Sequence, residues 1–496
     1  MASLINDLRQ LVEDSVLVLL GQGVALGGSF VVHTLLVRNL EPETFGVLSL
    51  GLTIASVGAG IAIFGMGQAV TRFISGAPLK QASSYIVVGM AVATTTSLFA
   101  AVTLYTYRDI LETFFAAPEL GGILQVFAVL IVIQPLKGIV LGAVRGFEKS
   151  RWKVISNDTL PFLINVPVLL YFVSQGDVLL GAIVFYFLQS LVRIVLLSYQ
   201  LGWWSEWTFE PVLPEREQFY EMVWFAWPLA FESLVVVFLG SIDILMLGRL
   251  ASTQKVGFYR SIQPVAKILI FLLQALTFIY LPMATRYFEQ ENLGELDAIY
   301  KAATRWLTFA TFPLFLFYLV LGDAFLRSLF SEEYVVAWSA LAILSVGMYS
   351  RVVAGPNGMT IKAINRTRED LIASIAALGT NFVLNYVLIP RYGIAGAAAA
   401  TTMGYAVYNL IDLLIIYRYT NVSPFHWKLV KPLVPTALIV FGIDQIVGFG
   451  RPSLVELFIV GVSVSVLHLG SILFTSSFTA EDWKLLNDLV RRSGQN

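Results

Sequence analysis

Apolar residues fill this chain in stretches of about 18 to 25, separated by short polar breaks. A stretch of that length crosses the hydrocarbon core of a bilayer as an α-helix. The chain is therefore expected to be an all-α integral membrane protein. The pattern predicts 14 transmembrane helices, at about residues 15–37, 45–67, 83–105, 121–144, 154–174, 178–199, 222–248, 257–283, 303–322, 335–362, 370–390, 393–417, 431–448 and 454–475.

Composition agrees with this pattern and excludes several classes of protein. Hydrophobic residues make up 57% of the chain, charged residues 13%, and the mean hydropathy is +0.77. The longest polar breaks, at 200–221 and 284–302, are too short for an extramembrane catalytic domain, so we do not expect an enzyme. The sequence lacks a phosphate-binding G-x-x-x-x-G-K-[ST] motif and has no cysteine, which argues against ATP hydrolysis and thiolate metal sites. No cofactor and no nucleic-acid partner are indicated.

Lysine and arginine are distributed unevenly over the breaks. With an even number of spans, the side that carries both termini collects about 20 of them and the other side about 8. Because cytoplasmic loops carry the excess of basic residues, both termini are predicted to be cytoplasmic, in a multi-pass protein of the cytoplasmic membrane. Residues 1–14 form an amphipathic segment at the N-terminus, and 476–496 form a cytoplasmic tail that contains a similar pattern.

An internal repeat divides the chain. Two motifs recur at equivalent places in the hydropathy pattern, at offsets of 211 and 214: Arg38 and Phe45–Gly46 match Arg249 and Val256–Gly257, and Thr71–Phe73 matches Thr285–Tyr287. Six predicted spans separate the copies, so both halves have the same orientation. The repeat predicts two parallel six-helix lobes, 15–200 and 222–418, joined by a cytoplasmic linker at 201–221 and followed by two more helices in 431–475.

Several segments resemble one family of exporters. They are Val37–Gly46, Phe64–Phe73, Asp243–Tyr259, Phe330–Tyr334 and Asn385–Ala398. Together they are similar to the polysaccharide-transporter branch, O-antigen-flippase-like, of the multidrug/oligosaccharidyl-lipid/polysaccharide exporter superfamily. The resemblance implies a 14-helix flippase that moves a lipid-linked oligosaccharide from the cytoplasmic to the outer leaflet by alternating access. It also implies membrane lipids and glycan polymerases or transferases as partners, while a monomer with two lobes suffices for transport.

Three other functions remain open at this point. Relatives in the same superfamily expel drugs or small molecules by ion coupling, and others flip the peptidoglycan precursor lipid II. A membrane glycan polymerase or ligase is the alternative from another class, but it would need a large outer loop with catalytic residues, and the predicted breaks contain none.

Basic residues inside the predicted spans are the candidate substrate contacts. The cargo that the resemblance implies is a polyprenyl phosphate or pyrophosphate, and Arg and Lys suit phosphate. Each such residue costs about 2.5–3.5 kcal/mol at mid-helix, so it should face a cavity, pair with an acid or snorkel. We expect a cationic cavity that contains Lys137, Lys267, Arg351, Arg193, Arg72 and His33. Snorkelling of Arg193, anchoring by Arg72 and a structural hydrogen bond of His33 are the alternatives.

Glu232, Asp243 and Asp412 are acidic residues that also fall within predicted spans. They either neutralise the basic residues or act as protonatable sites that couple transport to an ion gradient. Pairing is the interpretation that we favour, because an inside-negative potential already drives an anion outward by about 2.3 kcal/mol per charge per 100 mV.

Overall fold

The computed structural model describes residues 21, 23–147, 154–204, 212–447 and 452–477. The segment 1–14 and nearly all of the predicted tail lie outside these ranges. Within them every regular element is a helix, so the all-α prediction is confirmed for this part of the chain. Helices satisfy their own backbone hydrogen bonds, which a segment surrounded by lipid requires.

Eleven helical segments among the described residues are long and apolar enough to cross a membrane, as a multi-pass membrane protein requires. The predicted number of 14 stays a prediction. Two of its spans, 370–390 and 393–417, fall in a single 54-residue segment. Another, 431–448, corresponds to a helix of only 15 described residues.

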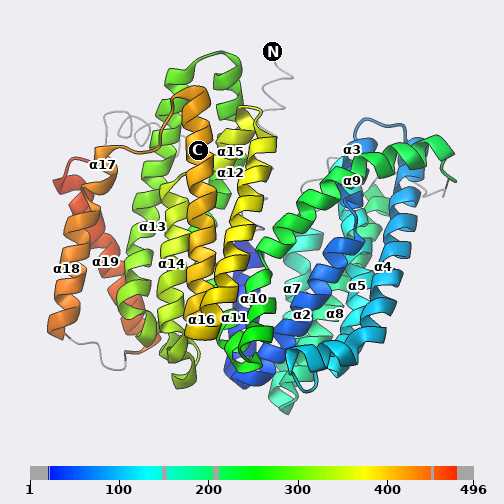
Figure 1. Ribbon diagram of the computed structural model, residues 1–496, viewed down its shortest axis with the longest axis horizontal. Coiled ribbons are helices and arrows are strands. Elements are labelled where there is room, and N and C mark those ends of the chain that lie inside the picture. Colours follow the sequence, from blue (N-terminus) through cyan, green and yellow to red (C-terminus); the bar gives the residue numbers. More distant parts are fainter. Residues whose placement is uncertain (1–20, 22, 148–153, 205–211, 448–451, 478–496) are drawn as a thin grey trace. The chain divides into compact units, whose positions relative to one another are not determined.

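The chain forms two compact units, Met1–Ser261 and Ile262–Asn496. Each is described by itself, and the lobes predicted from the repeat stay a prediction. In the first unit, residues 23–39 are helical. The helices that follow (Figure 1) are α2 (Pro42–Ala62), α3 (Met66–Ile74), α4 (Leu79–Phe115), α5 (Leu120–Gly146), the π-helix η1 (Val154–Thr159), α7 (Leu160–Gln175), α8 (Val178–Trp204), α9 (Arg216–Leu239), α10 (Ile242–Leu250) and the first part of α11 (Thr253–Lys267).

The predicted span 45–67 is interrupted in the structure. Phe64 and Gly65 adopt positive φ angles of 49° and 70°, so α2 ends before them and α3 begins after them. A Cβ atom on Gly65 would lie 2.5 Å from the Ala226 carbonyl oxygen on α9. A glycine at this position therefore allows both the left-handed turn and the close approach of α9.

The N-terminal ends of α2 and α11 meet backbone to backbone at two glycines of the sequence repeat. A Cβ atom on Gly46 would lie 1.8 Å from the Thr253 carbonyl oxygen, and one on Gly257 would lie 1.9 Å from the Pro42 carbonyl oxygen. Gly46 matches Gly257 in the repeat, and Pro42 matches Thr253 at the same offset of 211. The contact is therefore reciprocal, as a two-fold relation between the two motifs would give.

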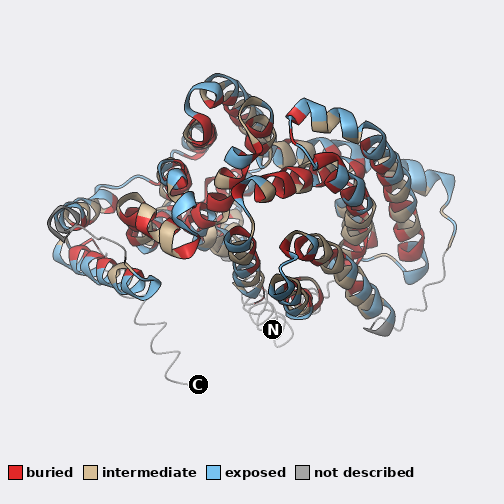
Figure 2. Cartoon of the chain, turned by 90° about the horizontal axis from the view of Figure 1, so that it is seen from below, coloured by how far each residue is buried: buried red, intermediate tan, exposed pale blue. Residues whose placement is uncertain are grey.

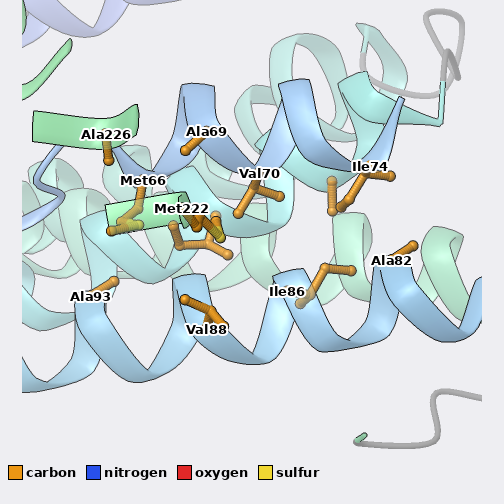
Figure 3. Close-up of a cluster of buried hydrophobic side chains, with 12 residues drawn as sticks. Met66, Ala69, Val70, Ile74, Ala82, Ile86, Val88, Ala93, Met222 and Ala226 are labelled. Carbon is orange, nitrogen blue, oxygen red and sulfur yellow. The ribbon is translucent and has the colours of Figure 1, made fainter. Parts of the chain in front are cut away.

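A hydrophobic cluster holds α3 among α4, α5 and α9. Figure 3 shows Met66 and Val70 of α3 beside Met222 of α9, with Ile86 and Val88 of α4 opposite them. Buried and exposed residues alternate along many of the helices (Figure 2), so these helices have an inner and an outer side. Large apolar side chains are common on the outer sides, as expected for helices that face lipid.

The second unit contains the rest of α11 followed by η2 (Ile268–Ile270), α12 (Phe271–Glu289), α13 (Leu293–Leu329), η3 (Glu332–Ala337), α14 (Trp338–Val353), α15 (Asn357–Ala363), α16 (Thr367–Thr420), α17 (Trp427–Val430), α18 (Leu433–Val447) and α19 (Leu454–Phe474). Its buried cluster includes Tyr280, Tyr300 and Ile361. The segment α16 consists of two helices joined at Gly393, whose φ of 56° and ψ of −126° suit glycine.

Candidate functional site

Two of the predicted cations lie together in the first unit. Lys137 is on α5, Arg193 is on α8, and Arg193 is the charged group that acts most strongly on Lys137. Both helices are candidate membrane spans, and both side chains are partly buried. The structure therefore brings together two positive charges that would be costly in lipid if each faced it alone.

A proline explains how Arg193 is held. Pro161 has no N–H, so it cannot donate the α-helical hydrogen bond to the carbonyl oxygen of Asn157. Arg193 Nε donates to that oxygen at 2.9 Å. The guanidinium also lies 5.8 Å from the ring centre of Phe162, within cation–π range. The carbonyl oxygen of Asn157, on the π-helix η1, thus fixes the position of the arginine.

Asn157 and Asp158, on η1, complete what we call the cationic cluster: Lys137, Arg193, Asn157 and Asp158. Asn157 Nδ2 donates to Asp158 Oδ1 at 2.6 Å, and the Asp158 charge acts on Arg193. Asp158 is only 9% exposed, and its Oδ2 makes no hydrogen bond within the described residues. Asp158 offsets the charge of Arg193, and Lys137 adds a second positive charge, so the cluster as the structure describes it carries an excess positive charge.

The chemistry of this cluster fits a phosphate group. Arg offers a planar set of N–H donors and Lys a compact charge, the two kinds of contact that phosphate oxygens accept. An anionic headgroup would neutralise the excess charge, and its hydrogen bonds to the cluster would be strengthened in a low-dielectric environment. A buried amide lies on the neighbouring helix α7: Asn165 is fully buried, and neither side-chain atom has a hydrogen-bond partner among the described residues.

Four other predicted residues of this unit are on different helical segments from Lys137 and Arg193. His33 Nε2 donates to the Ser261 carbonyl oxygen at 3.0 Å, which makes a structural hydrogen bond. Arg72 is exposed in the last turn of α3, and Glu232 is exposed on α9. Asp243 is 4% exposed, and its Oδ1 accepts the Ile244 N–H at 3.0 Å.

In the second unit, Arg351 and Asp412 lie within one polar group. The Arg351 guanidinium lies 4.9 Å from the ring centre of Tyr405, and its charge acts on Asp412. The Tyr408 hydroxyl donates to Asp370 Oδ1 at 2.7 Å. Because that hydroxyl has a single proton, it cannot donate to Asp412 at the same time.

Asp412 is the least satisfied acid of this group. It is fully buried, and neither carboxylate oxygen has a hydrogen-bond partner among the described residues. The neighbouring Asn409 is already engaged, since its Oδ1 accepts from Asn357 at 3.2 Å and its Nδ2 donates to Ser350 at 3.4 Å. A buried carboxylate with this environment needs a proton or a cation to offset its desolvation.

Lys267, the last predicted cation, is exposed within the second unit at the end of α11. Within the described ranges, no group of three or more His, Cys, Asp or Glu side chains is placed to hold a metal ion. The sequence reasoning missed Asn157, Asp158 and Asp370. Asp158 and Asp370 lie near the starts of the predicted spans 154–174 and 370–390. Only the structure shows which charged groups lie near them.

Comparison with known families gives two matches. Residues 11–288 match the family described as polysaccharide biosynthesis protein, and residues 228–387 match the MatE family. The first match contains the whole cationic cluster, and the second contains Arg351 and Asp370.

Two curated relatives are similar to this chain. A probable low-salt glycan biosynthesis flippase, Agl15 of Haloferax volcanii, is 24% identical over 221 residues, which cover 44% of this chain and 46% of the relative. The teichuronic acid biosynthesis protein TuaB of Bacillus subtilis is 23% identical over 368 residues, covering 69% of this chain and 71% of the relative. The alignment with Agl15 thus spans about half the length of that protein.

Among solved structures, the lipid II flippase MurJ in an inward closed conformation has a similar fold. The TM-score is 0.75, with 94% of this chain and 99% of that chain covered, at 12% sequence identity. At this identity the likeness concerns the fold. It agrees with the exporter architecture that the sequence resemblance implies.

Proposed function

The chain belongs to the polysaccharide biosynthesis protein family, and we propose that it is a flippase that carries a lipid-linked oligosaccharide across the membrane it spans. The observation that carries the proposal is the cationic cluster, in which α5 packs against α8 and places Lys137 near Arg193, whose Nε is held by the Asn157 carbonyl oxygen. The names of the relatives Agl15 and TuaB, which place them in glycan biosynthesis, support the same class of cargo.

The cluster determines which part of the cargo is recognised. A polyprenyl phosphate or pyrophosphate has an apolar tail that stays in lipid and an anionic headgroup that does not. Two cations within spans carry about 5–7 kcal/mol of insertion cost, and a bound anion would offset part of it. Lys137 and Arg193 therefore bind the phosphate, Asp158 keeps Arg193 in place, and the glycan follows the headgroup by alternating access.

The remaining parts of the proposal concern topology and partners. The protein lies in the cytoplasmic membrane with both termini in the cytoplasm, moves its cargo to the outer leaflet, and delivers it to a glycan polymerase or transferase. It works as a monomer and has no catalytic role. The membrane potential, inside negative, assists the outward movement of the phosphate by about 2.3 kcal/mol per charge per 100 mV.

The test is transport by charge variants in proteoliposomes that contain a polyprenyl-pyrophosphate oligosaccharide. Each charge-assisted hydrogen bond contributes about 1.5–3 kcal/mol, so Lys137→Gln and Arg193→Gln should each weaken substrate use roughly 10-fold to 100-fold. Lys137→Arg keeps the charge and should retain most activity. The matched control is Arg418→Gln, which removes an exposed cation from α16. Full transport by both Gln variants at normal protein levels would overturn the assignment.

An ion-coupled exporter of small molecules is the second candidate function. The buried Asp412, whose carboxylate oxygens have no hydrogen-bond partner among the described residues, favours it, as does the MatE match over residues 228–387. Under this alternative, Asp412→Asn abolishes transport driven by a proton or sodium gradient. Under the flippase proposal the same variant still carries the lipid-linked oligosaccharide when only a membrane potential is applied.

A further inference from the structure

A group of basic side chains lies where α17 and the loop before it pass over the beginning of α13. The Ser423 backbone N–H donates to Asp297 Oδ1 at 3.4 Å, which fixes the loop against α13. Leu429 of α17 is 3% exposed and anchors the short helix. Lys301 and Arg305 of α13 are thereby brought close to His426 and Lys428. We call these four side chains the basic interfacial site.

The charges of this site are nearly all of one sign. The charged groups that act on His426 are Lys428, Arg305 and Lys301. Asp297 is the acid that pairs there, with its Oδ2 2.5 Å from Lys301 Nζ. Within the described ranges Asp297 pairs with Lys301, and Lys428 adds a further positive charge beside them. Arg305 is only 7% exposed.

The protonation of His426 follows from the same geometry. Partial burial of the imidazole, followed by the positive charges of Lys428, Arg305 and Lys301, lowers the pKa of His426 below its ordinary value of 6.5. At neutral pH the imidazole is therefore uncharged. It adds a positive charge to the site only in acid.

The length of α13 places the site at the membrane surface. Its 37 residues span about 55 Å, whereas the hydrocarbon core is about 30 Å thick. Asp297 and Lys301 lie in its first turns, before the predicted span 303–322, and Arg305 lies at the start of that span. Next to them Trp427 is 70% exposed and Phe425 is 56% exposed. Exposed aromatic residues of this kind mark the level of the lipid headgroups.

We propose that the basic interfacial site binds the phosphate of an anionic phospholipid headgroup, with Trp427 and Phe425 resting in the interface beside it. Basic pockets at the ends of transmembrane helices hold anionic lipids through such contacts. The ligand chemistry is that of a phosphate diester. The membrane supplies it at high local concentration, and the aromatic side chains favour a lipid over a phosphate in solution.

The experiment measures lipid binding by the purified full-length protein in neutral detergent. Dioleoylphosphatidylglycerol, dioleoylphosphatidylcholine and inorganic phosphate are added separately, and bound lipid is counted by native mass spectrometry. Each cation near a membrane surface contributes a factor of about five in affinity. Lys428→Gln should weaken phosphatidylglycerol binding roughly fivefold, and the double variant Lys301→Gln/Lys428→Gln roughly 30-fold.

The control is the double variant Lys80→Gln/Arg216→Gln, which removes two exposed cations from the first unit and should leave binding within about twofold. Equal binding of phosphatidylcholine and phosphatidylglycerol would overturn the proposal. Unchanged affinity in the Lys301/Lys428 double variant would do the same. Displacement of the lipid by an equal concentration of inorganic phosphate would assign the site to a soluble anion instead. Because no transport is measured, these outcomes are independent of the flippase activity.

Discussion

Replacing either glycine of the reciprocal contact by alanine should destabilise the first unit by the same amount. The added Cβ of Gly46→Ala lies 1.8 Å from the Thr253 carbonyl oxygen, and that of Gly257→Ala lies 1.9 Å from the Pro42 carbonyl oxygen. Ordinary contact begins near 3.4 Å, so α2 and α11 must separate by about 1.6 Å, the difference between these distances. Both obstructing atoms belong to the backbone and cannot rotate away.

The size of the effect follows from two opposed contributions. Overpacking costs up to about 3 kcal/mol when the neighbouring atoms cannot yield. Alanine in place of glycine within a helix raises the free energy of unfolding by about 0.5–1 kcal/mol. The net loss for each variant is therefore about 2 kcal/mol.

The assay is unfolding of the purified protein in detergent, followed by tryptophan fluorescence. Gly379→Ala on α16 is the control, because nothing lies within 4 Å of its added Cβ. The Gly379→Ala variant should be more stable than the wild type by about 0.5–1 kcal/mol, whereas the other two variants should be less stable. Wild-type stability of Gly46→Ala or Gly257→Ala would refute the close contact. Clearly unequal losses would refute its reciprocity.

Three further predictions test other parts of the structure. Tyr408→Phe removes a charge-assisted hydrogen bond and should lower unfolding stability by about 1.5–3 kcal/mol, whereas Tyr417→Phe, exposed on the same helix, should change it little. Pro161→Ala supplies an N–H that competes with Arg193 for its carbonyl acceptor, so transport should fall several-fold while stability does not; unchanged transport would contradict this role. Because the pKa of His426 is lowered, phosphatidylglycerol affinity should rise as the pH falls below 6.5, and a His426→Gln variant should show no such rise.

Much of the fold could be predicted from the sequence, because a membrane span is specified by local hydropathy over about 20 residues. The places where a predicted span is interrupted in the structure could not be predicted in this way. The interruption at Phe64–Gly65 depends on the approach of α9, a contact between distant segments. The repeat did identify Gly46 and Gly257 as equivalent, but hydropathy says nothing of which helices touch. Their mutual contact is a property of the packed structure.

The sequence was enough to predict which types of residue form the candidate site. It was not enough to predict which of those residues lie together. Lys137 and Arg193 stood out because charges are costly within a span, whichever helices they occupy. Their proximity depends on how α5 packs against α8. Asn157 holds Arg193 through its carbonyl oxygen, which any residue could provide, and its amide donates to Asp158, a contact that depends on the packed structure. Asp158 lies near the start of its predicted span, and only the structure shows that Arg193 is close to it.

The proposed movement of a lipid-linked oligosaccharide between leaflets can be measured in cells. In cells that lack the protein and any redundant flippase, the glycan exposed on the outer face is labelled, and total lipid-linked oligosaccharide is extracted in parallel. We expect the intact intermediate to accumulate without outer labelling, and we expect the wild-type gene to restore labelling while Lys137→Gln/Arg193→Gln does not. Normal outer labelling in the absence of the protein would contradict it.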